Sequence, residues 1–312
     1  MEKKKLVAVA AAAVMVLGGG AAASAQTASP TASAASSATA SPLPQGSEPV
    51  KLDPADFTTR IDNPYWPMAP GDKWVYSEIE PGEPELRVEV TVTDRTKQIA
   101  NGVEARVVHD VVTEDGQPIE ITDDWYAQDK AGNIWYLGED TAEYKDGKIT
   151  TRSGSFEAGV DGAQAGIIMP ADPRDGMAYR QEYYEGEAED RAEVLSTDEQ
   201  VEVPFGHFEG ALMTKDLVPL EPKVSEYKLY ARDVGPVLTV KTSGGSGSEE
   251  LVSHSRADKA GASAGDTATA SGSASALAET GGAFSLTPLA PLALLAVLVG
   301  TGVLAFRVVR SD

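Results

Sequence analysis

The chain has 312 residues, no cysteine and a formal net charge of −22 at pH 7. Without cysteine it forms no disulfide, so its folded part needs a core large enough to be stable alone. Thiolate metal sites and cysteine nucleophiles are excluded for the same reason. Because binding to nucleic-acid phosphates relies on clustered Lys and Arg, the excess of 48 acidic over 26 basic residues disfavours a nucleic-acid partner.

Residues 1–25 have the pattern of a secretory signal peptide. Three lysines precede an apolar run from Leu6 to Leu17, and Ala23 and Ala25 form a small-residue cleavage site, so we expect cleavage before Gln26. The alternative is an N-terminal membrane anchor. It is disfavoured because the apolar run is short for a membrane span and ends in three glycines.

Two stretches of low complexity flank the predicted folded part. Residues 26–50 are mostly Ala, Ser, Thr and Pro, and residues 255–276 are mostly Gly, Ala, Ser and Thr. Neither composition can bury much apolar surface, so both predict disordered spacers. The chain between them, residues 51–254, is predicted to form one β domain.

Alternating polar and apolar residues, separated by turn signals, predict that this domain is all-β. Asn101-Gly102, Asp115-Gly116 and Asp146-Gly147 are hairpin dipeptides. Strands are expected at 74–76, 86–92, 103–113, 119–128, 134–138, 167–169, 178–184, 188–196, 200–203, 206–218, 225–230, 237–242 and 250–254. Because the strands are linked by short turns, we predict an antiparallel meander that forms a curved sheet or open barrel.

Two segments are less regular. Pro64, Pro67 and Pro70 predict an extended, non-helical segment before the first strand. Residues 154–176 are rich in Gly and Pro and predict a long loop, with 167–169 as its one short strand. Residues 185–196 have some helix propensity, but their amphipathic spacing is poor and a strand is favoured.

Several segments of the core resemble a family of secreted actinobacterial β domains. They are 61–67, 70–76, 124–129, 132–136, 179–184 and 203–206, with the sequences IDNPYWP, PGDKWVY, DWYAQD, GNIWY, YRQEYY and VPFG. The resemblance implies no particular activity. A looser likeness to the curved sheets of lipoprotein carriers rests on strand order alone.

No catalytic, cofactor or metal site is predicted. His109, His207 and His254 are the only histidines, and the sequence has no Gly-x-Ser-x-Gly or His-x-x-x-His motif and no EF-hand loop. The acidic pairs 123–124 and 139–140 are read as solvated turn acids, with calcium binding as the alternative. Glu139 and Glu182 are weak candidates for a glycosidase carboxylate pair.

The aromatic residues are the strongest hint of a ligand. Neighbours on a strand point to opposite faces, so one ring of Trp125-Tyr126 and one of Trp135-Tyr136 should be buried and the other exposed or capped. Exposed rings could stack on a sugar, although most large aromatics in a disulfide-free domain belong to the core. The candidate stacking residues are Trp66, Trp125, Trp135 and Tyr183.

The C-terminal residues 277–312 have the order of a processing signal. The motif Leu277-Ala278-Glu279-Thr280-Gly281 precedes an apolar run at 286–306 and then Arg307 and Arg310. This order resembles the LPxTG-like sorting signal of Gram-positive surface proteins, which sortase transpeptidases read. The resemblance implies a transmembrane helix at 286–306, cleavage after Thr280, and joining of Thr280 to the peptidoglycan precursor.

Together these patterns predict a secreted protein that is inserted in the membrane as a precursor and then anchored to the cell wall. The β domain is expected to be exposed and non-catalytic. A module that binds carbohydrate or a small apolar ligand is the alternative, and a hydrolase is less favoured. The expected partners are sortase and the peptidoglycan precursor, with no cofactor.

Overall fold

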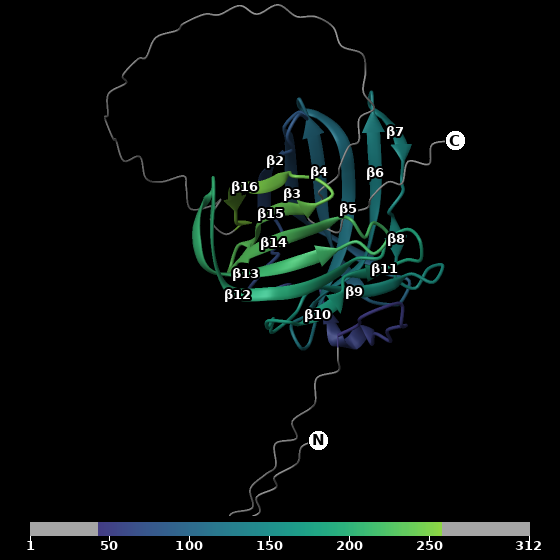
Figure 1. Cartoon of the computed structure of the whole chain (residues 1–312). Coiled ribbons are helices and arrows are strands. Elements are labelled where there is room, and N and C mark those ends of the chain that lie inside the picture. The colour runs from purple at the N-terminus through teal and green to yellow at the C-terminus, as the bar shows by residue number, and fades with distance from the viewer. Residues whose placement is uncertain (1–42, 258–312) are drawn as a thin grey trace, which may run out of the picture. The chain divides into compact units, whose positions relative to one another are not determined.

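The computed structural model describes residues 43–257 (Figure 1). The predicted signal peptide, sorting motif and transmembrane helix lie outside the described residues, as do most of both predicted spacers. Within the described part, no helix is both long and apolar enough to cross a membrane.

The described residues form one antiparallel sheet of sixteen strands, preceded by a short 3-10 helix η1 (Pro54–Asp56). The strands are β1 (Phe57–Thr58), β2 (Lys73–Ile79), β3 (Leu86–Gln98), β4 (Glu104–Glu114), β5 (Gln117–Asp129), β6 (Ile134–Lys145), β7 (Lys148–Thr151), β8 (Phe156–Glu157), β9 (Gln164–Met169), β10 (Ala178–Arg180), β11 (Glu182–Tyr183), β12 (Arg191–Val203), β13 (Gly206–Leu217), β14 (Ser225–Ala231), β15 (Gly235–Ser243) and β16 (Ser248–Ser255).

Most neighbours in the sheet are also neighbours in sequence. The order is β10-β12-β13-β14-β15-β16-β2-β3-β4-β5-β6-β9-β11, so the last strand, β16, pairs with β2. In Figure 1, β3–β6 stand nearly upright and β12–β14 run across in front of them. This arrangement confirms the predicted all-β meander.

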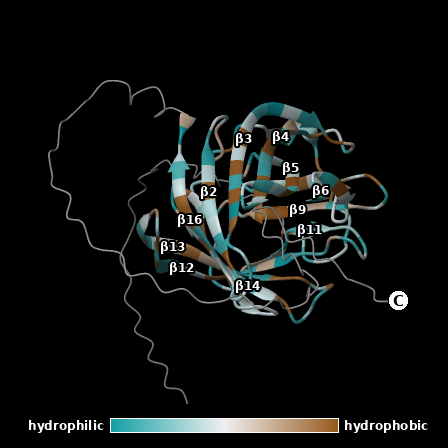
Figure 2. Cartoon of the chain, turned by 90° about the horizontal axis from the view of Figure 1, so that it is seen from above, coloured by the Kyte–Doolittle hydropathy of each residue, from teal (hydrophilic) through white to brown (hydrophobic). Residues whose placement is uncertain are grey.

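The two ends of the sheet path meet and nearly close the barrel. Only Gln181 separates β10 from β11, and the backbone N–H groups of Gln181 and Glu182 both donate to the carbonyl of Asp190, at 2.8 and 3.4 Å. Seen from above, the strands run around a common interior (Figure 2). Each strand therefore has an inner and an outer face.

Two hairpins have the backbone that their dipeptides predict. Both residues of Asp115-Gly116 and of Asp146-Gly147 have positive φ, as a type I′ turn requires. The turn at Asn101-Gly102 differs, because only its glycine has positive φ, and the Asn101 side chain accepts a hydrogen bond from the N–H of Val103 at 3.0 Å.

Three predicted elements differ in extent. Strand β12 is continuous from Arg191 to Val203, where the sequence predicted two strands. Its pairing with β13 has register shifts between Val194 and Val201, close to the predicted break. The predicted strand 178–184 is divided into β10 and β11 at Gln181. The loop 154–176 contains β8 and a β9 that begins three residues earlier than predicted.

The domain begins before the predicted boundary at residue 51. Pro44 accepts a hydrogen bond from the N–H of Arg180 at 2.7 Å, and the Arg180 guanidinium donates to the carbonyl of Glu48 at 2.9 Å. Residues 43–50 are therefore packed against the barrel, which corrects the predicted spacer at these positions. At the other end, β16 extends to Ser255, and the N–H of Ala257 donates to Asp72.

An aromatic cluster fills one part of the barrel interior. The Trp66 ring, from the proline-rich leading segment, lies 5.8 Å from Tyr126 of β5 and 6.0 Å from Tyr230 of β14, so it joins opposite sides of the sheet. Tyr126 in turn stacks on Tyr136 at 5.0 Å. Gly235, with φ of 110°, makes room for this packing, because a Cβ there would lie 2.8 Å from Trp66.

Candidate functional site

The aromatic residues predicted to stack on a sugar do not expose their ring faces to solvent. Trp66, Trp125 and Trp135 are buried, and only Tyr183 is half-buried. The ammonium of Lys97 lies 4.3 Å from the Trp125 ring centre. Trp135 packs edge-on against Phe57. Both outer rings are thus capped, and the proposed stacking on sugar loses its surface at all three tryptophans.

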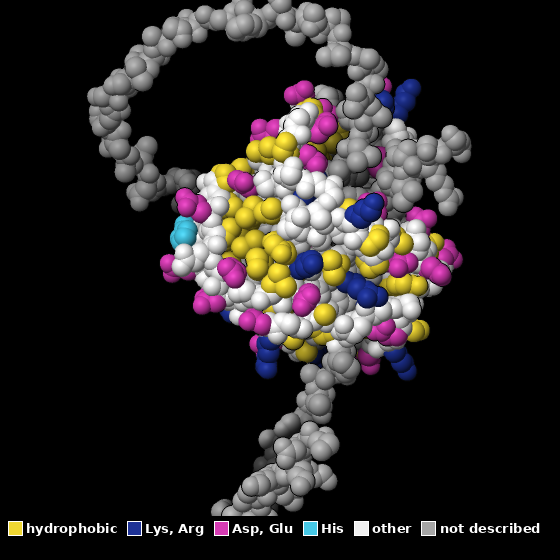
Figure 3. Space-filling model, viewed as in Figure 1, with side chains coloured by type: hydrophobic (Ala, Val, Ile, Leu, Met, Phe, Trp, Pro, Cys, Tyr) yellow, Lys and Arg dark blue, Asp and Glu magenta, His cyan; other side chains and the backbone are white. Residues whose placement is uncertain are grey.

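The inner face of the sheet is rich in carboxyl groups. Eleven acidic side chains are buried among the described residues, and Asp72 alone of them serves a turn at the edge of the barrel. Two lysines, Lys228 and Lys241, are buried with them. The ten interior acids are Glu78, Asp110, Glu120, Asp124, Glu139, Glu182, Asp190, Asp216, Glu226 and Glu249. Outside, in contrast, acidic side chains are spread among other types over the visible face (Figure 3).

The strand register sets some of these acids directly opposite one another. Asp124 of β5 faces Glu139 of β6, Asp216 of β13 faces Glu226 of β14, and Glu249 of β16 faces Glu78 of β2. Like charges in directly opposed positions destabilise a sheet. Burial adds to this cost, because an ionised carboxylate loses its hydration there.

A tyrosine joins the first of these pairs. The Tyr136 hydroxyl lies 2.8 Å from Asp124 Oδ1 and 2.9 Å from Glu139 Oε2. A hydroxyl has one proton to donate, so the second short contact requires a protonated carboxyl group that donates to the Tyr136 oxygen. In agreement, burial and then nearby negative charge raise the pKa of Asp124 and of Glu139.

Lys228 compensates the second pair. Its ammonium lies 3.2 Å from Asp216 Oδ2, which also accepts from Gln181, and Thr214 donates to Asp216 Oδ1 at 2.7 Å. Burial alone would lower the pKa of Lys228, but the charges of Asp216 and Glu226 outweigh burial and raise it. Asp216 is thus fully hydrogen-bonded.

The third pair borders a small recess, in which acceptors outnumber donors. Lys241 donates to Glu80 Oε2 at 2.9 Å and lies 3.9 Å from Glu78 Oε1. Both carboxyl oxygens of Glu226, and one oxygen each of Glu78 and Glu249, have no hydrogen-bond partner among residues 43–257. Glu226 is 1% exposed and Glu249 is 2% exposed.

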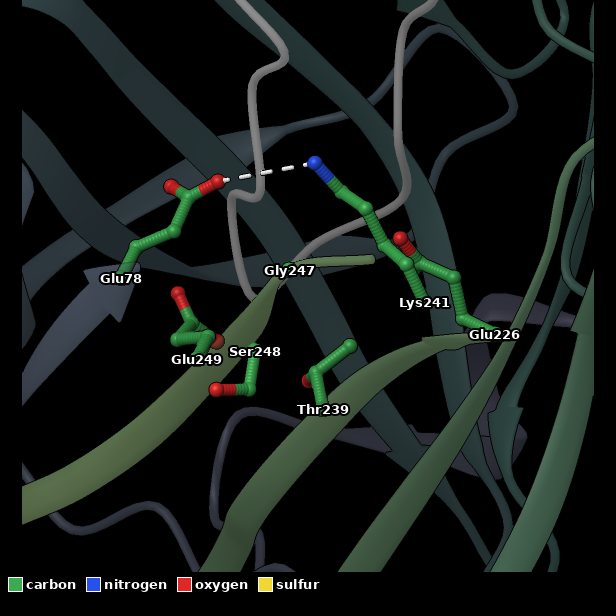
Figure 4. A pocket seen from close by; sticks show the side chains of 7 residues that line it. All are labelled: Glu78, Glu226, Thr239, Lys241, Gly247, Ser248 and Glu249. Atoms are coloured by element: carbon green, nitrogen blue, oxygen red, sulfur yellow. Dashed lines mark ion pairs between the residues drawn. The ribbon is translucent and has the colours of Figure 1, made fainter. Parts of the chain in front are cut away.

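The recess lies between β2, β14, β15 and β16, and Figure 4 shows the side chains that surround it. It contains about 150 Å³ of empty space, part of which is open to solvent. It is lined by Glu78, Glu226, Thr239, Lys241, Gly247, Ser248 and Glu249.

Burial dominates the electrostatics of the recess. It raises the pKa of Glu78 to about 7, although Lys241 opposes the shift. Burial, and next the charge of Glu78, raise the pKa of Glu249. Burial also raises the pKa of Glu226, with Lys228 acting in the opposite direction. Perturbed acids of this kind are typical of functional sites.

The histidines lie apart from this interior cluster of acids. His109 contacts Asp123 at 2.7 Å on the outer face, where Arg95 forms two hydrogen bonds of 2.8 Å to the same carboxylate. His254 stacks on Trp74 with ring centres 5.0 Å apart. His207 is exposed at the start of β13.

Of the acids considered in the sequence, Asp124, Glu139 and Glu182 lie in the interior, whereas Asp123 and Asp140 lie on the outer face. Within residues 43–257, no three His, Asp or Glu side chains gather so that they could hold a metal ion.

Sequence reasoning missed Glu78, Glu226, Lys241 and Glu249. One signal was present, because Glu226, Lys228 and Tyr230 share a face of β14. The other face carries Tyr227 and Leu229, so the pattern alone did not say which face is the inner one.

No protein-family model and no curated protein sequence matches the chain. Among solved structures, the chain is similar to a candidate lipoprotein from Parabacteroides distasonis. The similarity has a TM-score of 0.34 and 12% sequence identity, and it covers 61% of this chain and 98% of that one. A likeness of this extent carries no argument about function, which is therefore argued from the site.

Proposed function

We propose that the protein is displayed on the cell surface, anchored to the wall through Thr280, and that its barrel interior is a non-catalytic compartment for a positively charged ligand. The observation that carries the binding role is the recess with partnerless carboxyl oxygens on Glu78, Glu226 and Glu249. The anchoring role rests on the sequence from Leu277 to Arg310.

The cost of the interior supports a role beyond folding. A barrel of this size could be filled with apolar side chains, which would stabilise it without desolvating any charge. Instead, Glu249 and Glu78 face each other inside the protein, and neither is fully hydrogen-bonded. Local violations of folding rules of this kind are expected at functional sites.

The size and chemistry of the recess favour a small cation over the ligands first considered. Pockets for drug-sized ligands have volumes of about 300–1,000 Å³ and mostly apolar linings. The recess leaves no room for a separate water molecule between its side chains as they stand, and it is lined by three carboxylates and an ammonium. It thus suits neither a sugar ring nor an apolar chain.

Substitution of Glu249 by Gln tests whether the interior acids serve folding. Because burial raises the pKa of Glu249 and so disfavours the folded state at neutral pH, Glu249→Gln should stabilise the protein at pH 7. Urea unfolding of the full chain measures this change. Glu250→Gln, which removes a half-exposed carboxylate next in sequence, is the matched control and should change stability by less than about 0.5 kcal/mol. A clear loss of stability in Glu249→Gln would assign this acid to folding and contradict the proposed compartment.

Substitution of Thr280 by Ala tests the anchoring. The bond to the wall would be made at the Thr280 carbonyl, so Thr280→Ala should move the protein from the wall fraction to the medium or membrane. Immunoblots of fractionated cells after detergent extraction measure this. If the variant stays in the detergent-resistant wall fraction, sorting through Thr280 is wrong.

A further inference from the structure

We infer that the recess between β2, β14, β15 and β16 binds the primary ammonium group of a small organic ligand, and that Lys241 is a built-in competitor for this site. The inference rests on the proposed function and names the ligand class of the same site. Glu226 and Glu249 are the expected acceptors.

The acceptor atoms define what is missing from the recess. Glu226 has two oxygens without a hydrogen-bond partner, and Glu249 and Glu78 have one each. All three side chains are at least 97% buried, and Figure 4 shows them around the same space. A primary ammonium carries three N–H donors, so it could supply donors to three of these oxygens at once.

The existing contacts of Lys241 show that an ammonium suits the electrostatics of the recess. Its Nζ donates to Glu80 at 2.9 Å but stays 3.9 Å from Glu78. One lysine therefore compensates the acids at one edge and leaves both oxygens of Glu226 and one oxygen of Glu249 without a donor. A second ammonium would complete the set without introducing a new kind of interaction.

A metal ion fits the recess less well than an ammonium. Calcium takes six to eight oxygen ligands at about 2.3–2.6 Å. Among the residues that the structure describes, no group of three acids or histidines converges closely enough to hold a metal. Hydrogen bonds to N–H groups tolerate the wider spacing, because donor and acceptor lie about 2.7–2.9 Å apart in charge-assisted bonds.

The ligand and Lys241 cannot both keep their places. As the side chains stand, the recess leaves no room for a separate water molecule between them. Lys241 is one of the lining residues, and the side chain of its partner Glu80 is 24% exposed. A ligand would therefore enter as the Lys241 side chain moves outward with Glu80, which makes binding a competition between two ammonium groups.

Thermal unfolding of the full chain with added cations tests this inference. The probes are n-propylammonium, tetramethylammonium and calcium chlorides at pH 7 and constant ionic strength. A ligand that binds only the folded state raises Tm with its concentration. We expect n-propylammonium to raise Tm, and tetramethylammonium, which has the charge but no N–H donor, to leave it unchanged.

Two variants locate the effect in the recess. Glu226→Gln should weaken the apparent affinity for n-propylammonium at least tenfold, whereas Glu250→Gln on the outer side of β16 should leave it unchanged. Lys241→Met removes the competitor and should bind n-propylammonium at least tenfold more tightly, with part of its lost stability restored by the probe. If Lys241→Met does not fold, Glu226→Gln decides the assignment alone.

The outcomes separate this inference from the proposed function. An equal response to tetramethylammonium or a response to calcium alone would overturn the ammonium assignment and keep the cationic compartment. A full n-propylammonium response in Glu226→Gln would overturn the location. If none of the three cations raises Tm, both the ammonium site and the cationic compartment are wrong.

Discussion

Asp123 and Asp124 are adjacent in β5, yet their environments drive their pKa values in opposite directions. Asp123 lies on the outer face, and although burial opposes the shift, hydrogen bonds from His109 and Arg95 lower its pKa to about 2. Asp124 lies on the inner face, where burial and the charge of Asp110 raise its pKa well above the usual range. The outer acid has cationic partners, and the inner one has a tyrosine and more acids.

This difference teaches that the two faces serve different purposes. At Asp123 on the outer face the carboxylate has the cationic partners Arg95 and His109, which is an arrangement that stabilises the fold. On the inner face ten acids share two lysines, so several carboxyl groups remain protonated or without partners. Under the function proposed above, this arrangement would bind a cation at the expense of stability.

The largest effect on stability is expected at the buried ion pair between Lys228 and Asp216. Lys228→Met removes the only cation in contact with buried Asp216 among the described residues. Removal of one partner of a buried ion pair costs about 3–5 kcal/mol, because the other charge remains in the interior. Urea unfolding at pH 7 measures the loss. Lys215→Met, which removes a half-buried lysine from the outer face of the same hairpin, is the control and should change stability by less than about 0.5 kcal/mol. A loss of under about 1 kcal/mol in Lys228→Met would show that this buried ion pair does not stabilise the fold.

The next effect concerns pH. Because burial raises the pKa of Glu78 from its ordinary 4.5 to about 7, the folded protein holds a proton that the unfolded chain has released. The stability that this proton contributes is complete below pH 4.5 and is lost as pH rises through about 7. Stability should therefore fall across this window. The raised pKa of Glu78 alone corresponds to about 3 kcal/mol. The charged groups that face Glu78 are Glu80, Asp110, Glu226, Lys241 and Glu249.

Urea unfolding between pH 5 and pH 8 measures this slope. The raised pKa values of Glu120, Glu139 and Glu249 act in the same direction. Glu78→Gln should flatten part of the decline, since the amide does not titrate. If stability stays level or increases from pH 5 to pH 8, burial does not raise the pKa values of the inner acids. The contrast between the two faces would then be wrong.

The smallest effect is expected on the outer face. Asp123→Asn removes the contacts to Arg95 and His109, but all three side chains are partly exposed, so the expected loss is only about 1 kcal/mol at pH 7. The hydrogen bond to Asp123 is the main cause that raises the pKa of His109, so this pKa should fall toward its usual value, as an NMR titration of His109 measures. Asp94→Asn on the neighbouring strand should leave the His109 titration nearly unchanged. An unchanged His109 titration in Asp123→Asn would refute the outer contact as its cause.

Much of the fold could be predicted from local sequence. Hairpin dipeptides at 115–116 and 146–147 and the alternation in 86–92 indicate antiparallel neighbours, because turn geometry and side-chain period act over a few residues. The extents of β9 and β12 were less accessible, since their ends depend on pairing partners that are distant in sequence. The ordered contacts of 43–50 depend on buried Arg180, about 130 positions away, which composition does not report.

The candidate site was hidden by the composition of the strands. Both faces of β14 carry large residues, Tyr227 and Leu229 on one side and Lys228 and Tyr230 on the other, so periodicity alone could not say which face is inner. Among 48 acids, nothing local marked Glu226 or Glu249 as buried. The pairing of β16 with β2, which places Glu249 opposite Glu78, is not a local property.

The sequence by itself determined that the domain is an antiparallel β meander, because turn dipeptides and strand alternation act over short distances. Export and sorting are predictions from the same kind of short pattern. Only the tertiary structure decided which face of each strand is enclosed. Closure of the sheet turns one side of every strand inward, and the same closure separates Asp123, with its cationic partners, from Asp124 and the interior acids. The chemistry of the interior is thus a consequence of long-range pairing rather than of local pattern.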